Sequence, residues 1–283
     1  SDLIIMAARP GMGKTAFVLS LARNVAIDFG KPVAFFSLEM SSIQLVNRLI
    51  SSEIEIDSDK LKKGNLEQYE FEQLNAKIGK LAEAPLFLDD TPALSVFELR
   101  AKARRLVAQN GVQLIIVDYL QLMTTGTENR GNREQEISYI SRSLKSIAKE
   151  LNVPIIALSQ LSRAPETRGG TGRPILSDLR ESGAIEQDAD LVMFIYRPEY
   201  YKIDTLEDGT PTGGLAEILV SKHRNGATGD VRLRFVDRLS KFVDFDAVSN
   251  TISSGENAVD LSEPRTTTRP SKMNDIEDET EPF

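Results

Sequence analysis

The sequence predicts an α/β fold in which helices flank a mainly parallel central sheet. Apolar runs at 33–39, 114–118 and 153–159 are too uniformly hydrophobic for strands with one face in water, as is typical of buried parallel strands. Between these runs lie segments with apolar residues at three- and four-residue steps, most clearly at 134–151. A hydrophobic fraction of 41% in 283 residues is enough for the sizeable core that such a fold needs.

The first strand, residues 3–7, runs into a glycine-rich loop, and the helical pattern Phe17, Leu21, Val25 follows. This order is the context of a P-loop, whose glycines let backbone N–H groups turn toward phosphate oxygens. The lysine of a P-loop reaches the β- and γ-phosphates, and the next hydroxyl takes a Mg²⁺ position. Ala8 replaces the first glycine of the strict pattern, but a methyl group is tolerated there, and a plain glycine-rich turn would give the Lys-Thr pair no purpose. We therefore predict that a nucleoside triphosphate binds at Ala8, Arg9, Pro10, Gly11, Met12, Gly13, Lys14, Thr15 and Ala16, with Thr15 on the metal.

The elements that follow alternate between strands and helices, as this fold class requires. The helix after Ser41, its N-cap, has an inner stripe formed by Leu45, Val46, Leu49 and Ile50. In order, the patterns predict strand 33–39, the helix capped by Ser41, two polar helices within 57–83, strand 86–88, helix 95–109, strand 114–118, a polar loop at 124–133, helix 134–151 and strand 153–159.

Three of these strands end at polar side chains: Glu39, Asp118 and Gln160. Strand 114–118 is apolar until its terminal acid, the pattern of a Walker B strand, whose carboxylate holds Mg²⁺. A polar residue can simply end a strand, but ligands of an open parallel sheet bind outside the carboxyl ends of its strands, so these residues and the P-loop together predict one site. Glu39 is then the general base, because a carboxylate accepts a proton from water, and Gln160 senses the γ-phosphate.

The C-terminal part contains a basic loop and four more strands. Residues 161–177 are rich in Arg, Gly, Pro and Thr, and they reach the upper length limit for a loop without function. Lys222 and Arg224 are two residues apart at the end of a strand and therefore share a face. They form either a solvated edge or a pair of cations projected into the ATP of a neighbouring subunit, an arginine finger. The four strands are predicted at 190–196 and 215–222, with an antiparallel pair at 231–235 and 241–245.

Composition excludes several kinds of site. The chain has no cysteine and one histidine, which excludes disulfides, thiolate metal sites and a histidine-based metal centre. No apolar run approaches the ~18 residues of a membrane span, and the N-terminus lacks a signal-peptide pattern. We therefore expect a soluble, cytoplasmic protein with no membrane partner. The first residue, Ser1, lies so close to the P-loop that we expect the chain to be the middle of a longer polypeptide.

The sequence divides at residue 249. From there it has few large apolar residues and many Ser, Thr, Pro and acidic residues, which is the signature of disorder. This tail holds eight acidic and three basic residues, so it carries most of the net charge of −8 and leaves the folded part close to neutral. We therefore predict an ATPase domain at 1–248 and a disordered acidic tail at 249–283.

Six linked stretches form a more specific pattern than the P-loop alone. After the P-loop come Phe36-Ser37-Leu38-Glu39-Met40, Val117-Asp118-Tyr119-Leu120-Gln121-Leu122, Leu158-Ser159-Gln160-Leu161-Ser162-Arg163, Asp178-Leu179-Arg180-Glu181-Ser182-Gly183 and Ile185-Glu186-Gln187-Asp188-Ala189-Asp190. From residue 1 to about 246, they resemble the C-terminal motor domain of the bacterial replicative helicases, the DnaB family. The resemblance implies a RecA-like fold, a homo-hexameric ring around single-stranded DNA, ATP and Mg²⁺ as cofactors, and 5′–3′ unwinding, with primase and a helicase loader as partners.

The resemblance also implies residue roles. Arg48 faces the nucleotide, and Gln160 couples hydrolysis to the DNA loop. The catalytic set comprises Glu39, Lys14, Gln160 and, in the site of the neighbouring subunit, Lys222 and Arg224. His223 stands where glutamine is common in the family, a change that we expect to matter little. DNA contacts are expected from Arg180, Glu181 and Gly183, with further candidates in the variable loop at Arg163, Arg168 and Arg173.

Two alternatives remain open at this point. A RecA- or RadA-like recombination ATPase shares the fold and the P-loop, although the Ser-Leu-Glu-Met and Arg-Glu-Ser-Gly stretches favour the helicase. A non-enzymatic module that binds ATP as a structural element is the other, and Glu39 and Arg224 argue against it. The acidic end 275–283, closed by Pro-Phe, is similar to the tip of bacterial single-stranded-DNA-binding proteins. It either docks on a replication partner or serves only as a solubilising tail.

Overall fold

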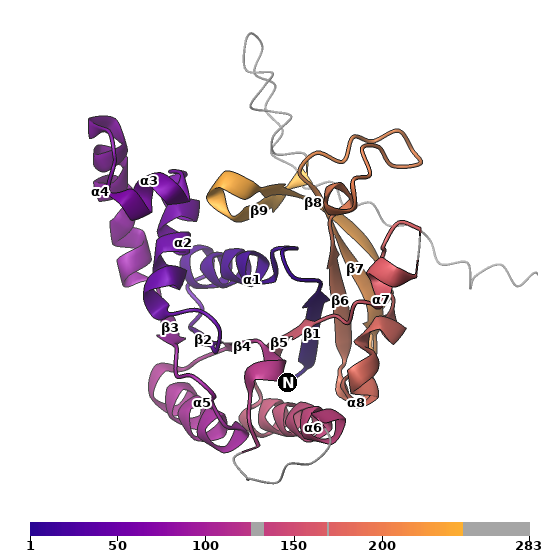
Figure 1. The fold of residues 1–283 in the computed structure, drawn as a ribbon. Helices are drawn as coiled ribbons and strands as arrows, with labels where there is room; N and C mark the ends of the chain where they lie inside the picture. Colours follow the sequence, from indigo (N-terminus) through magenta and orange to yellow (C-terminus); the bar gives the residue numbers. More distant parts are fainter. Residues whose placement is uncertain (126–132, 169, 246–283) are drawn as a thin grey trace, which may run out of the picture. The chain divides into compact units, whose positions relative to one another are not determined.

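The computed structural model describes residues 1–125, 133–168 and 170–245, with the side chains of residues 180–182 left aside. Contacts group residues 1–245 into one compact unit (Figure 1). The predicted tail lies outside the described residues, as does most of the predicted polar loop at 124–133. Within the described ranges, no helix is long and apolar enough to cross a membrane.

A single nine-stranded sheet forms the centre of the unit, in the order β3-β2-β4-β5-β1-β6-β7-β8-β9. The first six strands in that order are parallel, and the remaining three continue the sheet in antiparallel fashion. This confirms the predicted mainly parallel sheet and its antiparallel C-terminal edge. The strands are β1 (Leu3–Ala8), β2 (Val33–Ser37), β3 (Leu86–Asp89), β4 (Leu114–Asp118), β5 (Ile155–Gln160), β6 (Leu191–Tyr196), β7 (Leu215–His223), β8 (Gly229–Val236) and β9 (Lys241–Asp244).

Helices cover both faces of the sheet (Figure 1). Alternate residues of β1 enter different core clusters: Ile5 packs in the cluster that includes α5 and α6, whereas Met6 packs in the cluster that includes α1 and α2. Both faces of the central strands are therefore shielded from solvent, which explains their continuous apolar runs. The helices are α1 (Lys14–Arg23), α2 (Ser42–Ile54), α3 (Ser58–Lys63), α4 (Gln68–Glu83), α5 (Val96–Asn110), α6 (Arg133–Leu151), α7 (Ala164–Thr167) and α8 (Gly183–Asp188); a π-helical turn η1 (Asn24–Asp28) extends α1, and 3₁₀ turns lie at η2 (Leu120–Leu122), η3 (Leu176–Ser182), η4 (Pro198–Tyr201) and η5 (Asp237–Leu239).

The register of the parallel strands places their carboxyl ends level. Ala8, which ends β1, lies opposite Gln160 of β5, and Ser37, which ends β2, lies opposite Asp118 of β4. The loops that leave these strands therefore emerge along one edge of the sheet. The predicted meeting of the P-loop with the ends of three other strands follows from this register.

Local sequence explains where the helices begin and which face they bury. Ser41 is the N-cap of α2, as predicted, and forms a capping box with Gln44. The inner stripe of α2 was predicted less well: Leu45 and Leu49 are buried, but Val46 is 38% exposed. The buried face of α2 runs through Leu45, Leu49 and Ser52, and Val46 lies beside this face, on the side toward solvent.

Two other predicted boundaries need correction. The strand predicted to end at Glu39 ends at Ser37, because the Ser37 hydroxyl bonds the backbone of Met40 and turns the chain. The segment 161–177 is not a structureless loop. It contains the short helix α7, and the turn η3 begins at Leu176.

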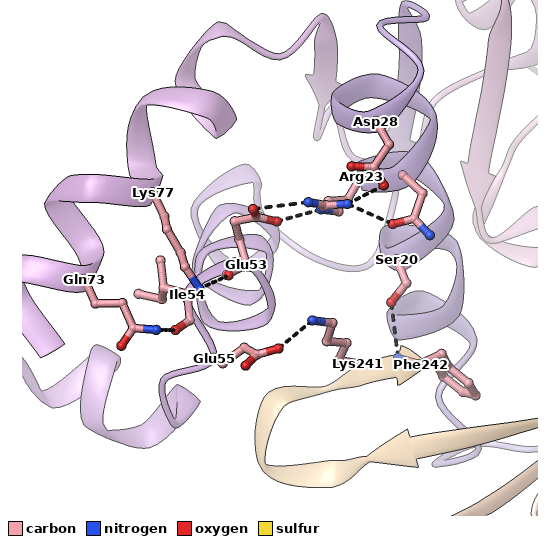
Figure 2. Close-up of polar contacts among 11 residues, drawn as sticks. Ser20, Arg23, Asp28, Glu53, Ile54, Glu55, Gln73, Lys77, Lys241 and Phe242 are labelled. Atoms are coloured by element: carbon pink, nitrogen blue, oxygen red, sulfur yellow. Dashed lines mark hydrogen bonds and ion pairs between the residues drawn. The ribbon is translucent and has the colours of Figure 1, made fainter. Parts of the chain in front are cut away.

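The β8–β9 hairpin is fastened to the helix that follows the P-loop (Figure 2). The Phe242 N–H donates to the Ser20 hydroxyl at 3.3 Å, and the Phe242 ring packs edge-on against Phe17. Lys241 reaches Glu55, the residue after α2, at 3.0 Å. The last described strand is thereby anchored beside the helix that follows the P-loop.

Candidate active site

The backbone of the P-loop requires glycine at two positions. Gly11 and Gly13 have φ values of 79° and 92°, which side-chain-bearing residues rarely adopt. A Cβ on Gly13 would lie 3.2 Å from the Phe242 ring, and one on Gly11 would lie 3.3 Å from the Tyr200 ring. Gly13 caps α1, so the N–H groups of the first turn of this helix are free to face an anion.

A cleft of about 340 Å³ lies over the P-loop and gathers residues from distant parts of the chain. Three residues predicted from the sequence enter it from other elements: Glu39, Arg48 and Gln160. Their convergence matches the predicted single site at the carboxyl edge of the sheet. The lining residues are Pro10, Gly11, Gly13, Lys14, Thr15, Ala16, Glu39, Met40, Arg48, Tyr119, Gln160, Phe235 and Ser240.

Three residues predicted to bind the nucleotide do not line the cleft. Ala8 and Met12 are buried in the core cluster under α1. Arg9 turns instead toward the segment after β5, where its guanidinium pairs with Glu166 at 2.8 Å and bonds the Leu161 carbonyl. Sequence spacing alone could not separate the loop residues that face the cleft from those that anchor the loop.

Thr15 and Asp118 meet at the base of the cleft. The Thr15 hydroxyl donates to Oδ2 of Asp118 at 2.7 Å, and the carboxyl group is only 1% exposed. Its Oδ1 is buried without a hydrogen-bond partner among the described residues. Burial raises the pKa of Asp118 to about 6, with a further contribution from the negative charge of Glu39, although the Thr15 hydrogen bond opposes the shift.

This donor set fits a magnesium ion bound with a phosphate ligand. Mg²⁺ is usually held by one or two carboxylates together with substrate phosphates and waters, and an uncompensated buried carboxylate oxygen beside a hydroxyl offers such a place. Across the described residues, no cluster of three acidic, histidine or cysteine side chains could form an all-protein metal site.

Lys14 is held close to the loop that carries it. Its ammonium group donates to the Ala8 carbonyl at 3.2 Å. Burial lowers the pKa of Lys14, while the negative charges of Asp118 and Glu39 raise it and limit the shift. A flexible, half-buried cation in this place can turn from its own backbone to an incoming phosphate.

A turn between β2 and α2 presents Glu39. Ser37 Oγ donates to the Met40 carbonyl at 2.7 Å and accepts from the Met40 N–H at 3.1 Å, which closes a ring around the turn. The Leu38 N–H donates to the Asp118 carbonyl at 2.7 Å. Glu39 is therefore exposed to the cleft on a backbone that is fixed on both sides.

Gln160 ends β5, and Gln121 holds its backbone. The Gln121 side chain accepts from the Gln160 N–H at 3.2 Å and donates to the Ser159 hydroxyl at 2.9 Å. Gln121 belongs to the stretch after Asp118 that carried the family resemblance, but its residue type alone gave no sign of this contact.

Sequence reasoning missed the residues that form the other wall of the cleft. Phe235 and Ser240 belong to the β8–β9 hairpin, and Tyr119 follows β4. Arg197 lies over the Phe235 ring at 4.2 Å and donates to the Gly11 carbonyl at 3.4 Å. None of these residues belongs to a phosphate-binding pattern, so only the folded chain reveals them.

Two of the arginines predicted to contact DNA are paired with carboxylates. Arg168 pairs with Asp178 at 2.8 Å, and Arg173 pairs with Glu217 and Asp230. Arg163 is exposed, and Gly183 begins α8. The side chains of Arg180 and Glu181 lie outside the described part of the chain.

Lys222 and Arg224 also lie outside the P-loop cleft. Both contact the last turn of α8: Lys222 donates to the Glu186 carbonyl, and Arg224 donates to the Gln187 carbonyl at 3.2 Å. The structure thus confirms that the two cations share a face and places that face away from the phosphate loop of their own chain.

Comparisons with known proteins agree with this geometry. The family model of the DnaB-like helicase C terminal domain matches residues 1–244. The replicative DNA helicases DnaC of Bacillus subtilis (strain 168) and DnaB of Geobacillus stearothermophilus are each 48% identical over 246 residues, which cover 87% of this chain and 53% of theirs. The chain therefore spans about half the length of the curated relatives that it matches.

Solved structures give the same result. One of them, described as an ATPase domain, superposes with a TM-score of 0.79 at 38% identity, over 86% of this chain and 84% of that one. A DnaB-like replicative helicase, described with its interactions with primase, superposes equally well over 57% of its own length. Together with the match over residues 1–244, these similarities show that the chain belongs to the DnaB-like helicase C-terminal domain family.

Proposed function

We propose that this chain is the ATP-hydrolysing motor domain of a replicative DNA helicase. The observation that carries the proposal is the cleft that brings Lys14, Glu39 and Gln160 together above the Thr15–Asp118 pair. Family membership supports the replicative role, because the relatives are replicative DNA helicases.

The residues predicted from the sequence have distinct parts in the proposed hydrolysis. The free N–H groups of the P-loop and the Lys14 ammonium bind the phosphates, and Glu39 accepts a proton from the attacking water. Gln160 lies at the end of β5, where it contacts the γ-phosphate and couples hydrolysis to the segment that follows the strand. Thr15 and Asp118 would hold Mg²⁺, which neutralises charge on the phosphate oxygens when it is bound.

The cleft is completed in trans by Lys222 and Arg224 of a neighbouring subunit. Within one chain these cations lie outside the cleft, so they can serve a nucleotide only across a subunit interface. An arginine finger of this kind contributes a factor of ~10³–10⁵ to the rate. The arrangement supports a homo-hexameric ring in which each ATP lies between two subunits.

The proposed ring encloses single-stranded DNA and moves along it in the 5′–3′ direction. We expect the DNA contacts to come from the segment Arg180–Gly183, with a weaker contribution from Arg163. Arg168 and Arg173 are less available for DNA, because each is already paired with a carboxylate. Tracking a backbone through a ring needs local positive potential rather than a basic protein. Primase and a helicase loader are the proposed partners, with the cytoplasm as the site of action.

Replacing Lys14 tests the motor function. In assembled oligomers, we expect Lys14→Ala to reduce ATP hydrolysis and forked-duplex unwinding to background, whereas Lys63→Ala, on an exposed lysine of α3, leaves both unchanged. Strand pairing without unwinding by the wild-type protein would favour a recombination ATPase. ATP binding without any DNA-stimulated hydrolysis would favour a non-enzymatic assembly module.

A further inference from the structure

Asp190 lies in the short link between α8 and β6, and its carboxylate has a separate partner on each oxygen. The side chain is buried, with 7% exposed. Oδ2 accepts the Leu3 N–H at the start of β1, at 2.8 Å, and the ammonium of Lys145 from α6. Oδ1 pairs with the Arg224 guanidinium at 3.3 Å. The first two partners belong to the core of the unit, so they fix the direction in which the carboxylate faces Arg224.

The main chain of Asp190 also holds Arg224. Its carbonyl accepts the Arg224 N–H at 2.8 Å, and its N–H donates to the Leu3 carbonyl at 2.9 Å. The backbone just beyond β7 is therefore tied to the backbone at the start of β1. Arg224 cannot shift along the direction of β7 without breaking its bonds to Asp190.

Asp190 carries its charge in the folded protein. Burial alone would favour the neutral acid, but hydrogen bonds from Lys145 and Leu3 and the charges of Lys145 and Arg224 hold the pKa of Asp190 below its ordinary value. An ionised carboxylate gives a directional, charge-assisted contact to a guanidinium. Arg224 nevertheless remains 50% exposed, so the contact orients the group without burying it.

Backbone carbonyls of α8 accept hydrogen bonds from both Lys222 and Arg224. Arg224 donates to Gln187 and Lys222 donates to Glu186, both in the last turn of α8. Cations are favoured beside the unpaired carbonyls of a helix C-terminus. Both cations thus rest on a surface formed by Asp190 and the end of α8.

We propose that Asp190 is a positioning residue for Arg224, which it holds in the orientation needed to meet the phosphates of a neighbouring subunit. The inference rests on the proposed function, in which Arg224 acts in trans. A preset guanidinium loses little freedom when the nucleotide arrives, and misplacing such a group by about 1 Å can cost ~10²-fold in rate. Because β1 runs from the Asp190 contact to the P-loop, one strand links the two half-sites that each subunit supplies.

Asp190→Asn tests the proposal, because it removes the charge but keeps an oxygen for the Leu3 N–H. In assembled oligomers, we expect kcat for ATP hydrolysis to fall about tenfold to 100-fold while KM changes less than about twofold. The matched control is Asp2→Asn, which removes an exposed carboxylate near Lys145 and has no contact with Arg224 among the described bonds. Equal losses of kcat in both variants would overturn the proposal, because they would mark general damage to the cluster.

Subunit mixing separates a positioning role from a structural one. Lys14→Ala subunits cannot hydrolyse their own ATP but supply an intact Arg224 to a neighbour. Mixed one to one with Asp190→Asn subunits, they should restore hydrolysis at about a quarter of the interfaces in a ring. No restoration would overturn the proposal, since Asp190 would then act on the nucleotide of its own subunit.

The same experiment with Arg224→Ala keeps the two hypotheses apart. If the mixture of Arg224→Ala and Lys14→Ala subunits does not recover activity, the trans-acting finger itself is wrong. If that mixture recovers and the Asp190→Asn mixture does not, only the positioning role fails. Light scattering and thermal unfolding of every variant confirm that assembled, folded subunits are compared.

Discussion

The parallel and antiparallel parts of the sheet contribute to the cleft in different ways. The residues proposed to touch phosphate, metal and water follow the parallel strands β1, β2, β4 and β5, where residue type and spacing already indicate chemistry. The antiparallel strands β7–β9 supply aromatic side chains that support the P-loop, together with two cations that lie outside the cleft. In the proposed motor, the parallel part therefore carries the chemistry of its own site, while the antiparallel part supports that site and serves the site of a neighbouring subunit.

This division separates two kinds of sensitivity to mutation. A change in the parallel part should remove a chemical step and leave the fold intact. A change in the antiparallel hairpin should weaken the fold and affect the P-loop only through packing, because Phe242 limits the space around Gly13. The following predictions test whether the two parts can be separated in this way.

The largest effect is expected from Glu39→Gln. Loss of the proposed base should lower kcat for ATP hydrolysis by about 10³-fold, while nucleotide affinity, measured by fluorescence titration, stays nearly unchanged. Glu55→Gln, on an exposed carboxylate outside the cleft, is the control and should hydrolyse ATP normally. Normal turnover in the Glu39 variant would show that the parallel part does not supply the base.

A smaller effect, on stability, is expected from Phe242→Ala in the antiparallel hairpin. The ring packs against Phe17 and Phe235 and is 8% exposed, so its removal should lower the free energy of unfolding by about 3 kcal/mol. Urea unfolding measures this loss, and nucleotide affinity should fall with it because Gly13 loses its neighbour. Val231→Ala, on the exposed side of β8, should change stability by less than about 0.5 kcal/mol.

Asp118→Asn is expected to stabilise the ligand-free protein above pH 6. The pKa of Asp118 is raised to about 6, chiefly by burial, so the folded state holds a proton that the unfolded chain releases between about pH 4 and pH 6. Wild-type stability is therefore lost as pH rises through that window, and a neutral asparagine avoids the loss. The variant should gain about 3 kcal/mol at pH 8 and nothing below pH 4, although it should no longer hydrolyse ATP. Equal urea midpoints at pH 8 would contradict this view of the site.

The sequence was informative where side chains act through residue type and uninformative where they act through packing. Lys14, Thr15, Glu39, Asp118 and Gln160 could be predicted to lie in one site because the register of parallel strands brings together their carboxyl ends and the loops that follow them. The contact of Phe242 with the P-loop could not, because nothing in an apolar pattern specifies which distant glycine a ring will meet.

Charge patterns were incomplete for a related reason. Arg168 and Arg173 lie in a stretch that is basic in sequence, which suggested free cations for DNA. In the fold, Asp178 neutralises one, and Glu217 and Asp230, from β7 and β8, neutralise the other. Local composition does not reveal acidic partners that arrive from distant strands.

The smallest effect is expected from Lys241→Met, which removes the ion pair between the hairpin and the end of α2. Lys241 is 26% exposed and its partner Glu55 is 56% exposed, so water screens most of their attraction. We expect the free energy of unfolding to fall by less than about 1 kcal/mol, since such surface pairs contribute little. Urea unfolding of Lys241→Met, Glu55→Gln and the double variant gives the coupling directly, and its decrease at high salt distinguishes charge from packing. A loss as large as that of Phe242→Ala would mean that an ion pair, rather than aromatic packing, holds the antiparallel part against the P-loop helix.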